Sequence, residues 1–140
     1  SLRENRYQGF TVGIERCTQG IIREKKTEER RKHQMKLWID DVRPAPEGYV
    51  WCKSVISAKR RIMANDQYAA QPNHHYSWDI ELIDIDHDAG DYASDGGDYI
   101  KLLDWLEETG RRYPIRIHSM NPVGVANMRA IIKRNGWKEI

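Results

Sequence analysis

Three aspartates stand at every second position at the end of an apolar stretch. Asp84, Asp86 and Asp88 follow one another in this way, and His87 lies between the last two. Because an ionised carboxylate is costly to bury without a partner, acids at the mouth of a core strand indicate a cation, a substrate or solvent beside them. A strand that stays regular would place all three on one face. The alternative is an acidic loop whose carboxylates pair with arginine side chains.

Two other apolar segments also end in polar side chains. Residues 35–39 lead into Asp40 and Asp41, and a later run leads into His118 and Ser119. The first segment is typical of a central parallel strand that is buried on both faces. In layered α/β folds the ligand site lies outside the carboxyl ends of the strands. The convergence of three separate segments therefore predicts a functional site at one edge of a sheet.

Carboxylates gathered in this way predict a site for a hard cation. Oxygen-rich donor sets suit Mg²⁺ or Mn²⁺ better than a closed zinc site, and the nearby histidines also admit a transition metal. The spacing is similar to that of a calcium loop, but the turn glycine is displaced to Gly90 and Asp95 replaces the bidentate glutamate, so we reject that interpretation. The predicted metal ligands are Asp40, Asp41, Asp86 and Asp88.

Polar side chains beside the acids predict contacts to a phosphate. Arg43 stands just beyond the acid pair and would clamp a phosphate, or would simply neutralise one of the acids. Ser119 and the amides of the helix start at Asn121 form a candidate phosphate cradle, although capping alone explains the Asn121 side chain better. Hydrogen bonds from His118 to the carboxylates would raise its pKa, which is compatible with acid catalysis.

Apolar periodicity predicts alternating strands and helices that position these residues. Strands are expected at 35–39, 49–52, 81–85, 114–119 and 137–140, and helices after Ser54, from Tyr99 to Gly110 and from Pro122 to Gly136. The loop 42–48 is too short for a crossover helix. Either it runs back extended along the sheet edge or the second strand is antiparallel.

Two expectations concern the helices. Residues 65–77 are predicted to be a polar connection after the first helix. The buried stripe of the last helix is predicted to contain Val123, Asn127, Ala130 and Ile131, although the polar Asn127 weakens this pattern.

Composition indicates a soluble globular protein. Of the 140 residues, 31% are charged and 39% apolar, and no apolar run approaches the length of a membrane span. No secretory signal is expected, because no apolar core follows the basic residues near the start. Cys17 and Cys52 stand far apart without a CxxC pair, which predicts reduced thiols and a cytoplasmic location.

Residues 1–34 differ in composition from the rest of the chain. We interpret them as a charged and partly helical N-terminal extension of a domain over 35–140. Residues 21–34 are almost all charged, and a basic arm that contacts a polyanion is one interpretation. A solvated helix or a leader sequence is the favoured alternative.

The order of the motifs resembles the receiver domain of response regulators. The resemblance is closer to a small bacterial and phage family, the cyclic-phosphate-processing receiver-like domain, whose three motifs are similar to residues 37–44, 86–90 and 118–124. It covers about residues 35–140. It implies a three-layer receiver-like or flavodoxin-like α/β fold, with a mostly parallel sheet of about five strands and without the first and last receiver helices.

The resemblance also implies residue roles. Asp40, Asp41 and Asp86 take the metal-binding and acceptor positions of a receiver, and Ser119 takes its hydroxyl position. The additions to the receiver pattern are His87, Asp88, His118 and Asn121. A receiver has a lysine after its fifth strand, whereas this chain has only Lys138 nearby, so ordinary phosphorelay signalling is not expected.

The family is proposed to act on cyclic phosphate ends or cyclic nucleotides. We therefore expect a metal-dependent phosphoesterase whose substrate is a cyclic nucleotide or RNA that ends in a cyclic phosphate. The expected catalytic residues are His87 as general base, His118 as general acid, and Asp86. One alternative is a non-catalytic receiver-like module that binds a phosphorylated ligand or partner. Another is a phosphoacceptor domain in which Asp86 receives a phosphoryl group.

Overall fold

The computed structural model describes residues 34–69 and 79–140. The predicted N-terminal extension lies outside the described residues, apart from Gln34, which belongs to the first strand. Most of the predicted connection 65–77 also lies outside them. None of the helices within the described residues is long and apolar enough to cross a membrane.

The sheet consists of four parallel strands in the order β2-β1-β3-β4. Their bounds are β1 Gln34–Ile39, β2 Tyr49–Cys52, β3 Asp79–Ile85 and β4 Ile115–Ile117. The second strand is thus parallel to the first, which settles the direction that the sequence left open. The connection 40–48 runs back without a helix, and the Trp38 indole Nε1 holds it against the sheet by donating to the Arg43 carbonyl oxygen at 2.9 Å.

An irregularity in β3 decides which side chains face the core. Met35 pairs with Ile80 but Lys36 pairs with Leu82, so Glu81 is an extra residue in the ladder. Such a bulge shifts the alternation of faces by one position. As a result Ile83 lies opposite Leu37 on the core face, and the following aspartate lies on the other face of the sheet.

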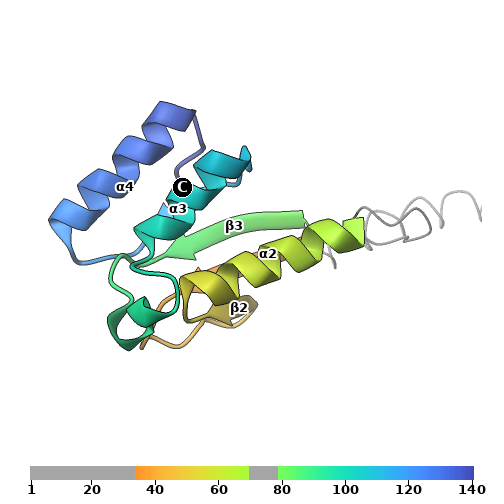
Figure 1. The fold of residues 1–140 in the computed structure, drawn as a ribbon, viewed down its shortest axis with the longest axis horizontal. Coiled ribbons are helices and arrows are strands. Elements are labelled where there is room, and N and C mark those ends of the chain that lie inside the picture. Colours follow the sequence, from red (N-terminus) through yellow and green to blue (C-terminus); the bar gives the residue numbers. More distant parts are fainter. Residues whose placement is uncertain (1–33, 70–78) are drawn as a thin grey trace, which may run out of the picture. The chain divides into compact units, whose positions relative to one another are not determined.

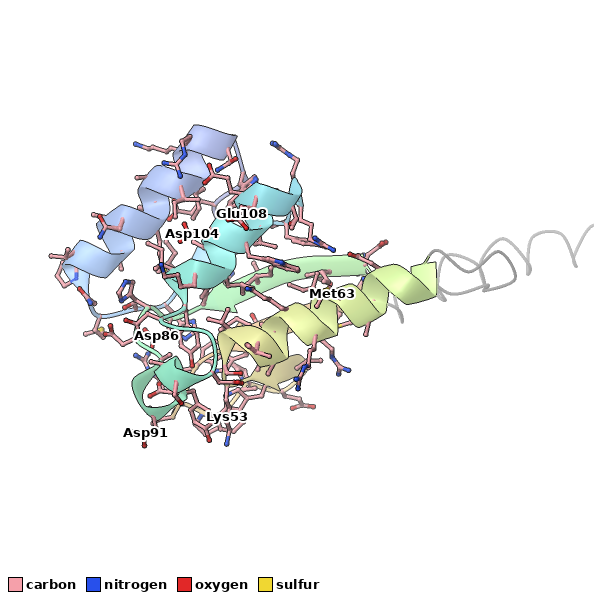
Figure 2. The ribbon with its side chains drawn as sticks, viewed as in Figure 1. Lys53, Met63, Asp86, Asp91, Asp104 and Glu108 are labelled. Carbon is pink, nitrogen blue, oxygen red and sulfur yellow. The ribbon has the colours of Figure 1, made fainter. Side chains whose placement is uncertain are left out.

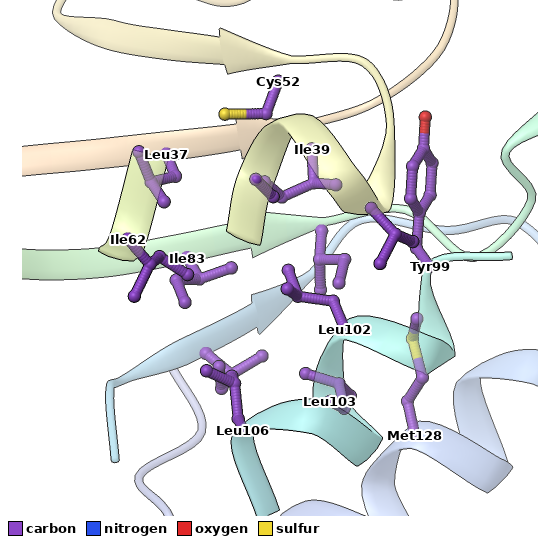
Figure 3. Close-up of a cluster of buried hydrophobic side chains, with 14 of the residues drawn as sticks. Leu37, Ile39, Cys52, Ile62, Ile83, Tyr99, Leu102, Leu103, Leu106 and Met128 are labelled. Atoms are coloured by element: carbon purple, nitrogen blue, oxygen red, sulfur yellow. The ribbon is translucent and has the colours of Figure 1, made fainter. Parts of the chain in front are cut away.

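Three helices cover one face of the sheet (Figure 1). They are α2 Val55–Ala69, α3 Ile100–Thr109 and α4 Pro122–Asn135, and α3 contacts both of the others. Figure 3 shows Leu102, Leu103 and Leu106 of α3 packed toward Leu37 and Ile83 of the strands. The described residues place no helix on the second face, so this receiver-like α/β fold has two layers within them where three were predicted.

Local signals explain the bounds of the helices. Asn121 caps α4, because its Oδ1 accepts from the Gly124 amide at 3.0 Å, and Pro122 occupies the first helical position. Gly110 and Gly136 end α3 and α4 in the left-handed conformation. The helix α2 extends to Ala69, so the prediction that a polar connection begins at residue 65 was wrong.

The predicted buried stripe of α4 was also wrong for three of its four positions. Val123, Asn127 and Ala130 are exposed, whereas Ile131 is buried as predicted. The buried positions of the helix are Gly124, Met128, Ile131 and Ile132. The buried stripe begins at Gly124, one residue later than predicted. Because Gly124 has no side chain, the start of α4 can lie close to His87 in the loop after β3. The chain end adds only an isolated parallel bridge between Glu139 and Ile115 where a last strand was expected.

Candidate metal and phosphate site

Three strands deliver polar side chains to one point at their carboxyl ends. Asp40 follows β1, Asp86 follows β3, and His118 follows β4. One ligand atom from each lies within 4.8 Å of those of the other two. Figure 2 shows Asp86 toward the same end of the molecule as Lys53 and Asp91. The convergence that the sequence predicted at this edge of the sheet therefore includes a carboxylate or imidazole from each of the three segments.

Asp40 is the most enclosed member of this acidic centre, which we define as Asp40, Asp86 and His118. It is fully buried. Its Oδ1 accepts from the amides of Val42 and Arg43 at 3.0 and 2.9 Å, and its Oδ2 accepts from His118 Nε2 at 2.8 Å. Burial raises the pKa of Asp40, but these hydrogen bonds outweigh burial and hold the pKa below its usual range. Asp40 is therefore an ionised carboxylate fixed in one orientation.

His118 bridges two buried carboxylates. Its Nδ1 lies 2.7 Å from Asp84 Oδ1, and its ring stacks on Trp38 with centroids 3.9 Å apart and an interplanar angle of 4°. Burial lowers the pKa of His118, but the hydrogen bonds and charges of Asp84 and Asp40 outweigh burial and raise the pKa above 6.5. With a carboxylate at each ring nitrogen, the imidazolium form donates two hydrogen bonds.

Asp84 is the functional residue that our site prediction left out. It is 2% exposed and lies on the face opposite the helices. Besides His118, its carboxylate meets Arg116 Nη1 at 3.3 Å and the Tyr49 hydroxyl at 3.5 Å. The signal for it was a lone acid inside an apolar strand, which needs a buried partner. The expectation that the three aspartates share a face applied to a regular strand, and β3 ends at Ile85, before Asp86 and Asp88.

Arg43 reaches across the acidic centre. Its Nε lies 3.7 Å from Asp40 Oδ2 and its Nη2 lies 3.9 Å from Asp86 Oδ2. Its Nη1 donates to the His118 carbonyl oxygen at 3.4 Å. The side chain is 47% exposed, so it faces the centre on one side and solvent on the other. Both sequence interpretations of Arg43, neutralising the acids and meeting a phosphate, are compatible with this position.

Two predicted metal ligands lie outside the group of three. Asp41 is directed at the loop after β3, where a Cβ on Gly90 would lie 2.3 Å from Asp41 Oδ2. Asp88 has a 63% exposed side chain, and its Oδ1 lies 2.8 Å from His87 Nδ1. The structure therefore places Asp41 beside the centre and pairs Asp88 with a histidine.

His87 and the start of α4 pack against each other. The Gly124 position lies so close that a Cβ there would be 2.4 Å from the His87 ring carbon Cγ. Asn121 Nδ2 lies 3.4 Å from both His87 Nδ1 and Asp88 Oδ1. His87 is thus held as a carboxylate-paired imidazole whose side chain is 15% exposed.

Two of the amides at the start of α4, those of Asn121 and Gly124, are already partnered. The Asn121 amide donates to Ser119 Oγ at 3.1 Å, and the Gly124 amide donates to Asn121 Oδ1. Pro122 has no amide hydrogen to offer. The Asn121 side chain is therefore a helix cap, in agreement with its favoured interpretation, and a phosphate contact at Ser119 and Asn121 stays a prediction.

The donor set of the acidic centre fits a divalent cation. Two carboxylates supply the hard oxygen atoms that Mg²⁺ and Mn²⁺ prefer, and an imidazole nitrogen is a ligand that Mn²⁺ also accepts. Asp84 would orient the imidazole from its other nitrogen, a frequent arrangement around metal-binding histidines. Asp40, Asp86 and His118 could therefore hold a metal.

The fold and the site together define a receiver-like α/β domain with an acidic centre at the carboxyl ends of its parallel strands. The model of the cyclic-phosphate processing receiver domain matches residues 35–134. The chain belongs to this family, as the sequence motifs indicated. The comparisons with curated proteins and with solved structures returned no match.

Proposed function

We propose that this protein is a metal-dependent phosphoesterase that opens cyclic phosphates, in cyclic nucleotides or at RNA ends. The observation that carries the proposal is the placement of His118 between two buried carboxylates, next to Asp86. Opening a cyclic phosphate requires a proton for the leaving alkoxide. A histidine with a raised pKa holds that proton near neutral pH.

Some residues of the site would bind the cation or the phosphate, and others would transfer protons. Asp40 and Asp86 would hold the cation, with Asp41 beside them, and Arg43 would meet the phosphate from its solvent side. A bound Mg²⁺ or Mn²⁺ offsets negative charge that develops on the phosphate oxygen atoms. In this proposal the carboxylates alone hold the cation, so His118 Nε2 keeps the proton that it shares with Asp40 Oδ2 and delivers it to the leaving oxygen. Asp84 accepts from Nδ1 and keeps the ring in place.

His87 is the proposed general base. Its Nδ1 faces the Asp88 carboxylate, which would stabilise the imidazolium formed when the ring takes a proton from water. The backbone amide of His87 donates a hydrogen bond to Asp86 Oδ1 at 2.7 Å. This bond fixes the start of the His87 residue against the acidic centre.

The first experiment measures product release from 2′,3′-cyclic and 3′,5′-cyclic nucleotides with Mg²⁺, with Mn²⁺ or with a chelator. We expect metal-dependent turnover in the wild type and a loss of roughly a hundredfold or more in Asp86→Asn and in His118→Ala. The matched control is Asp91→Asn, because Asp91 is an exposed aspartate at the same end of the molecule and has no place in the centre. Melting curves of all variants show whether folding is retained.

Unchanged hydrolysis in His118→Ala would exclude this residue as the acid. No turnover with any nucleotide, combined with retained binding of metal and nucleotide, would favour the second candidate, a receiver-like module that binds a phosphorylated ligand or partner. The partly exposed Arg43 guanidinium favours this second function, since it can recognise a phosphate without any reaction.

A phosphoacceptor role for Asp86 receives less support. The lysine that the sequence offered for it, Lys138, lies beside Ile115, and its carbonyl oxygen accepts from the Ile115 amide. Ile115 begins β4, whereas Asp86 follows the carboxyl end of the neighbouring β3. Labelling with acetyl phosphate that vanishes in Asp86→Asn would restore this candidate.

A cytoplasmic location and a polyanion contact through residues 21–34 remain parts of the proposal.

A further inference from the structure

A pair of exposed aromatic rings with a lysine between them lies next to the acidic centre. Trp51 and Tyr92 are 36% and 38% exposed, which is high for aromatic side chains. The Lys53 Nζ lies 4.4 Å from the centroid of the Trp51 ring and 5.9 Å from that of the Tyr92 ring. We call these three residues the Trp51 surface.

One direct hydrogen bond joins the Trp51 surface to the acidic centre. Trp51 Nε1 donates to the carbonyl oxygen of Asp40 at 2.8 Å, so the indole borders the residue whose carboxylate meets His118. The Lys53 carbonyl oxygen accepts from the hydroxyl of the buried Tyr99 at 2.6 Å, which fixes the backbone beneath the lysine. Tyr92 stands two residues after Gly90, which lies close to the Asp41 carboxylate, so Tyr92 is also near the acidic centre along the chain.

The chemistry of these three side chains suits a flat, polar heterocycle. Exposed aromatic rings stack on nucleobases of any sequence, and a lysine adds a charge and three hydrogen-bond donors for ring carbonyls or nitrogens. A cyclic phosphate without a base offers nothing that would use the rings. A second cluster of cations on an aromatic ring serves as a reference. Lys59 and Arg111 lie at Trp105, which packs against the core and, within the described residues, makes no hydrogen bond to the acidic centre.

We propose that the Trp51 surface binds the nucleobase of a substrate whose phosphate lies at the acidic centre. The inference rests on the proposed function for the position of the phosphate, and it adds the surface that recognises the base. The base stacks on Tyr92, because Lys53 already lies over the Trp51 ring at 4.4 Å, and Lys53 contacts the polar edge of the base. Base-free cyclic phosphates, such as those of sugars or glycerol, are then poorer ligands.

The test compares two stable phosphate monoesters of secondary alcohols. Adenosine 2′-phosphate carries a base on its ribose, and glycerol 2-phosphate carries neither a base nor a ribose, so the Tyr92 variants assign the difference to the base. Dissociation constants are measured by NMR titration of the full chain with Mg²⁺ present. We expect the nucleotide to bind roughly tenfold more tightly, the effect of one stacked base. Tyr92→Leu should remove most of this difference without changing the affinity for glycerol 2-phosphate, and Tyr92→Phe should retain it. Trp51 is a poor first target because its indole also bonds Asp40.

A matched pair of lysine variants tests the charge. Lys53→Met should weaken nucleotide binding severalfold, whereas Lys59→Met, the same change beneath another tryptophan, should not. Equal affinity for the two monoesters, no measurable nucleotide binding, or equal weakening of both ligands by Tyr92→Leu would overturn the inference. Preference for the nucleotide without turnover of any cyclic phosphate would support the base-binding surface and reject the proposed esterase function. Turnover of cyclic phosphates without a preference for the nucleotide would support the esterase function and reject the base-binding surface.

Discussion

At the scale of single residues, the function proposed for the acidic centre depends on how one imidazole is held. His118 has a carboxylate at each nitrogen and an indole against its face, so its position and its proton are both fixed. Asp84 contributes to this although it lies outside the group that could hold a cation. We interpret Asp84 as a positioning residue whose own charge is balanced by Arg116.

The first residue-scale prediction concerns the pKa of His118 in the chelator-treated protein. Proton NMR of the His118 ring should give a pKa above 6.5, and Asp84→Asn should lower it, because one of the two stabilising carboxylates loses its charge. The matched control is Asp104→Asn on α3, which removes a carboxylate that is not hydrogen-bonded to the ring. An unchanged pKa in Asp84→Asn would contradict the role of Asp84.

The same shift predicts how stability changes with pH. The folded-state pKa of His118 lies above the unfolded value of about 6.5, so the protonated ring stabilises the fold fully below that pH. This contribution is lost as the pH rises through the folded-state pKa. Urea unfolding of the wild type at several pH values should therefore show a decline over this window, and the decline should be smaller in Asp84→Asn.

At the scale of elements, the start of α4 and the loop after β3 fit together only because residue 124 is a glycine. Gly124 is buried in the first turn of α4, and the His87 ring occupies the space of its missing side chain. Asn121 caps the same turn and also approaches His87 and Asp88. The helix start therefore positions the proposed base.

The element-scale prediction is that Gly124→Ala destabilises the protein and displaces His87. Alanine in an exposed helix position would stabilise by about 1 kcal/mol, but overpacking a close contact costs about 1–3 kcal/mol, so the net change is unfavourable. Urea unfolding measures the stability and NMR shifts report the His87 ring. Asn127→Ala on the exposed side of the same helix should not destabilise. Equal stability of the two variants would show that the contact is easily relieved.

At the scale of the whole molecule, the described residues from 34 onward assemble a core of their own. Its members come from all four strands and all three helices, from Met35 to Trp137. The helices lie on one face, and the second face carries the charged and aromatic side chains around Asp84. The acidic centre lies at the carboxyl ends of the strands, at the edge between these two faces.

The whole-molecule prediction concerns the proposed division at residue 34. A chain that begins at Gln34 should unfold cooperatively in urea, with a midpoint close to that of the full chain, because the described residues from Gln34 onward supply a core cluster of their own. Metal-dependent activity, if the full chain has it, should also be retained. Loss of cooperative unfolding would show that residues 1–33 belong to the domain.

The sequence by itself predicted the class of fold, most elements and the three segments of the centre. These signals are local: apolar runs that end in acids, Asn121-Pro122 at a helix start, and glycines at helix ends. The family resemblance was confirmed by the match over residues 35–134. Asp40, Asp86 and His118 could be predicted because the carboxyl ends of parallel strands meet at one edge.

Only the tertiary structure decided which of these residues act on one another. The bulge at Glu81 turned Asp84 to the second face, where it meets His118, and no local pattern contains the pairing register that does so. The direction of β2 and the stripe of α4 likewise follow from packing rather than from periodicity. Contacts between residues far apart in the sequence determine both features. The pattern of residues along the sequence does not contain these contacts.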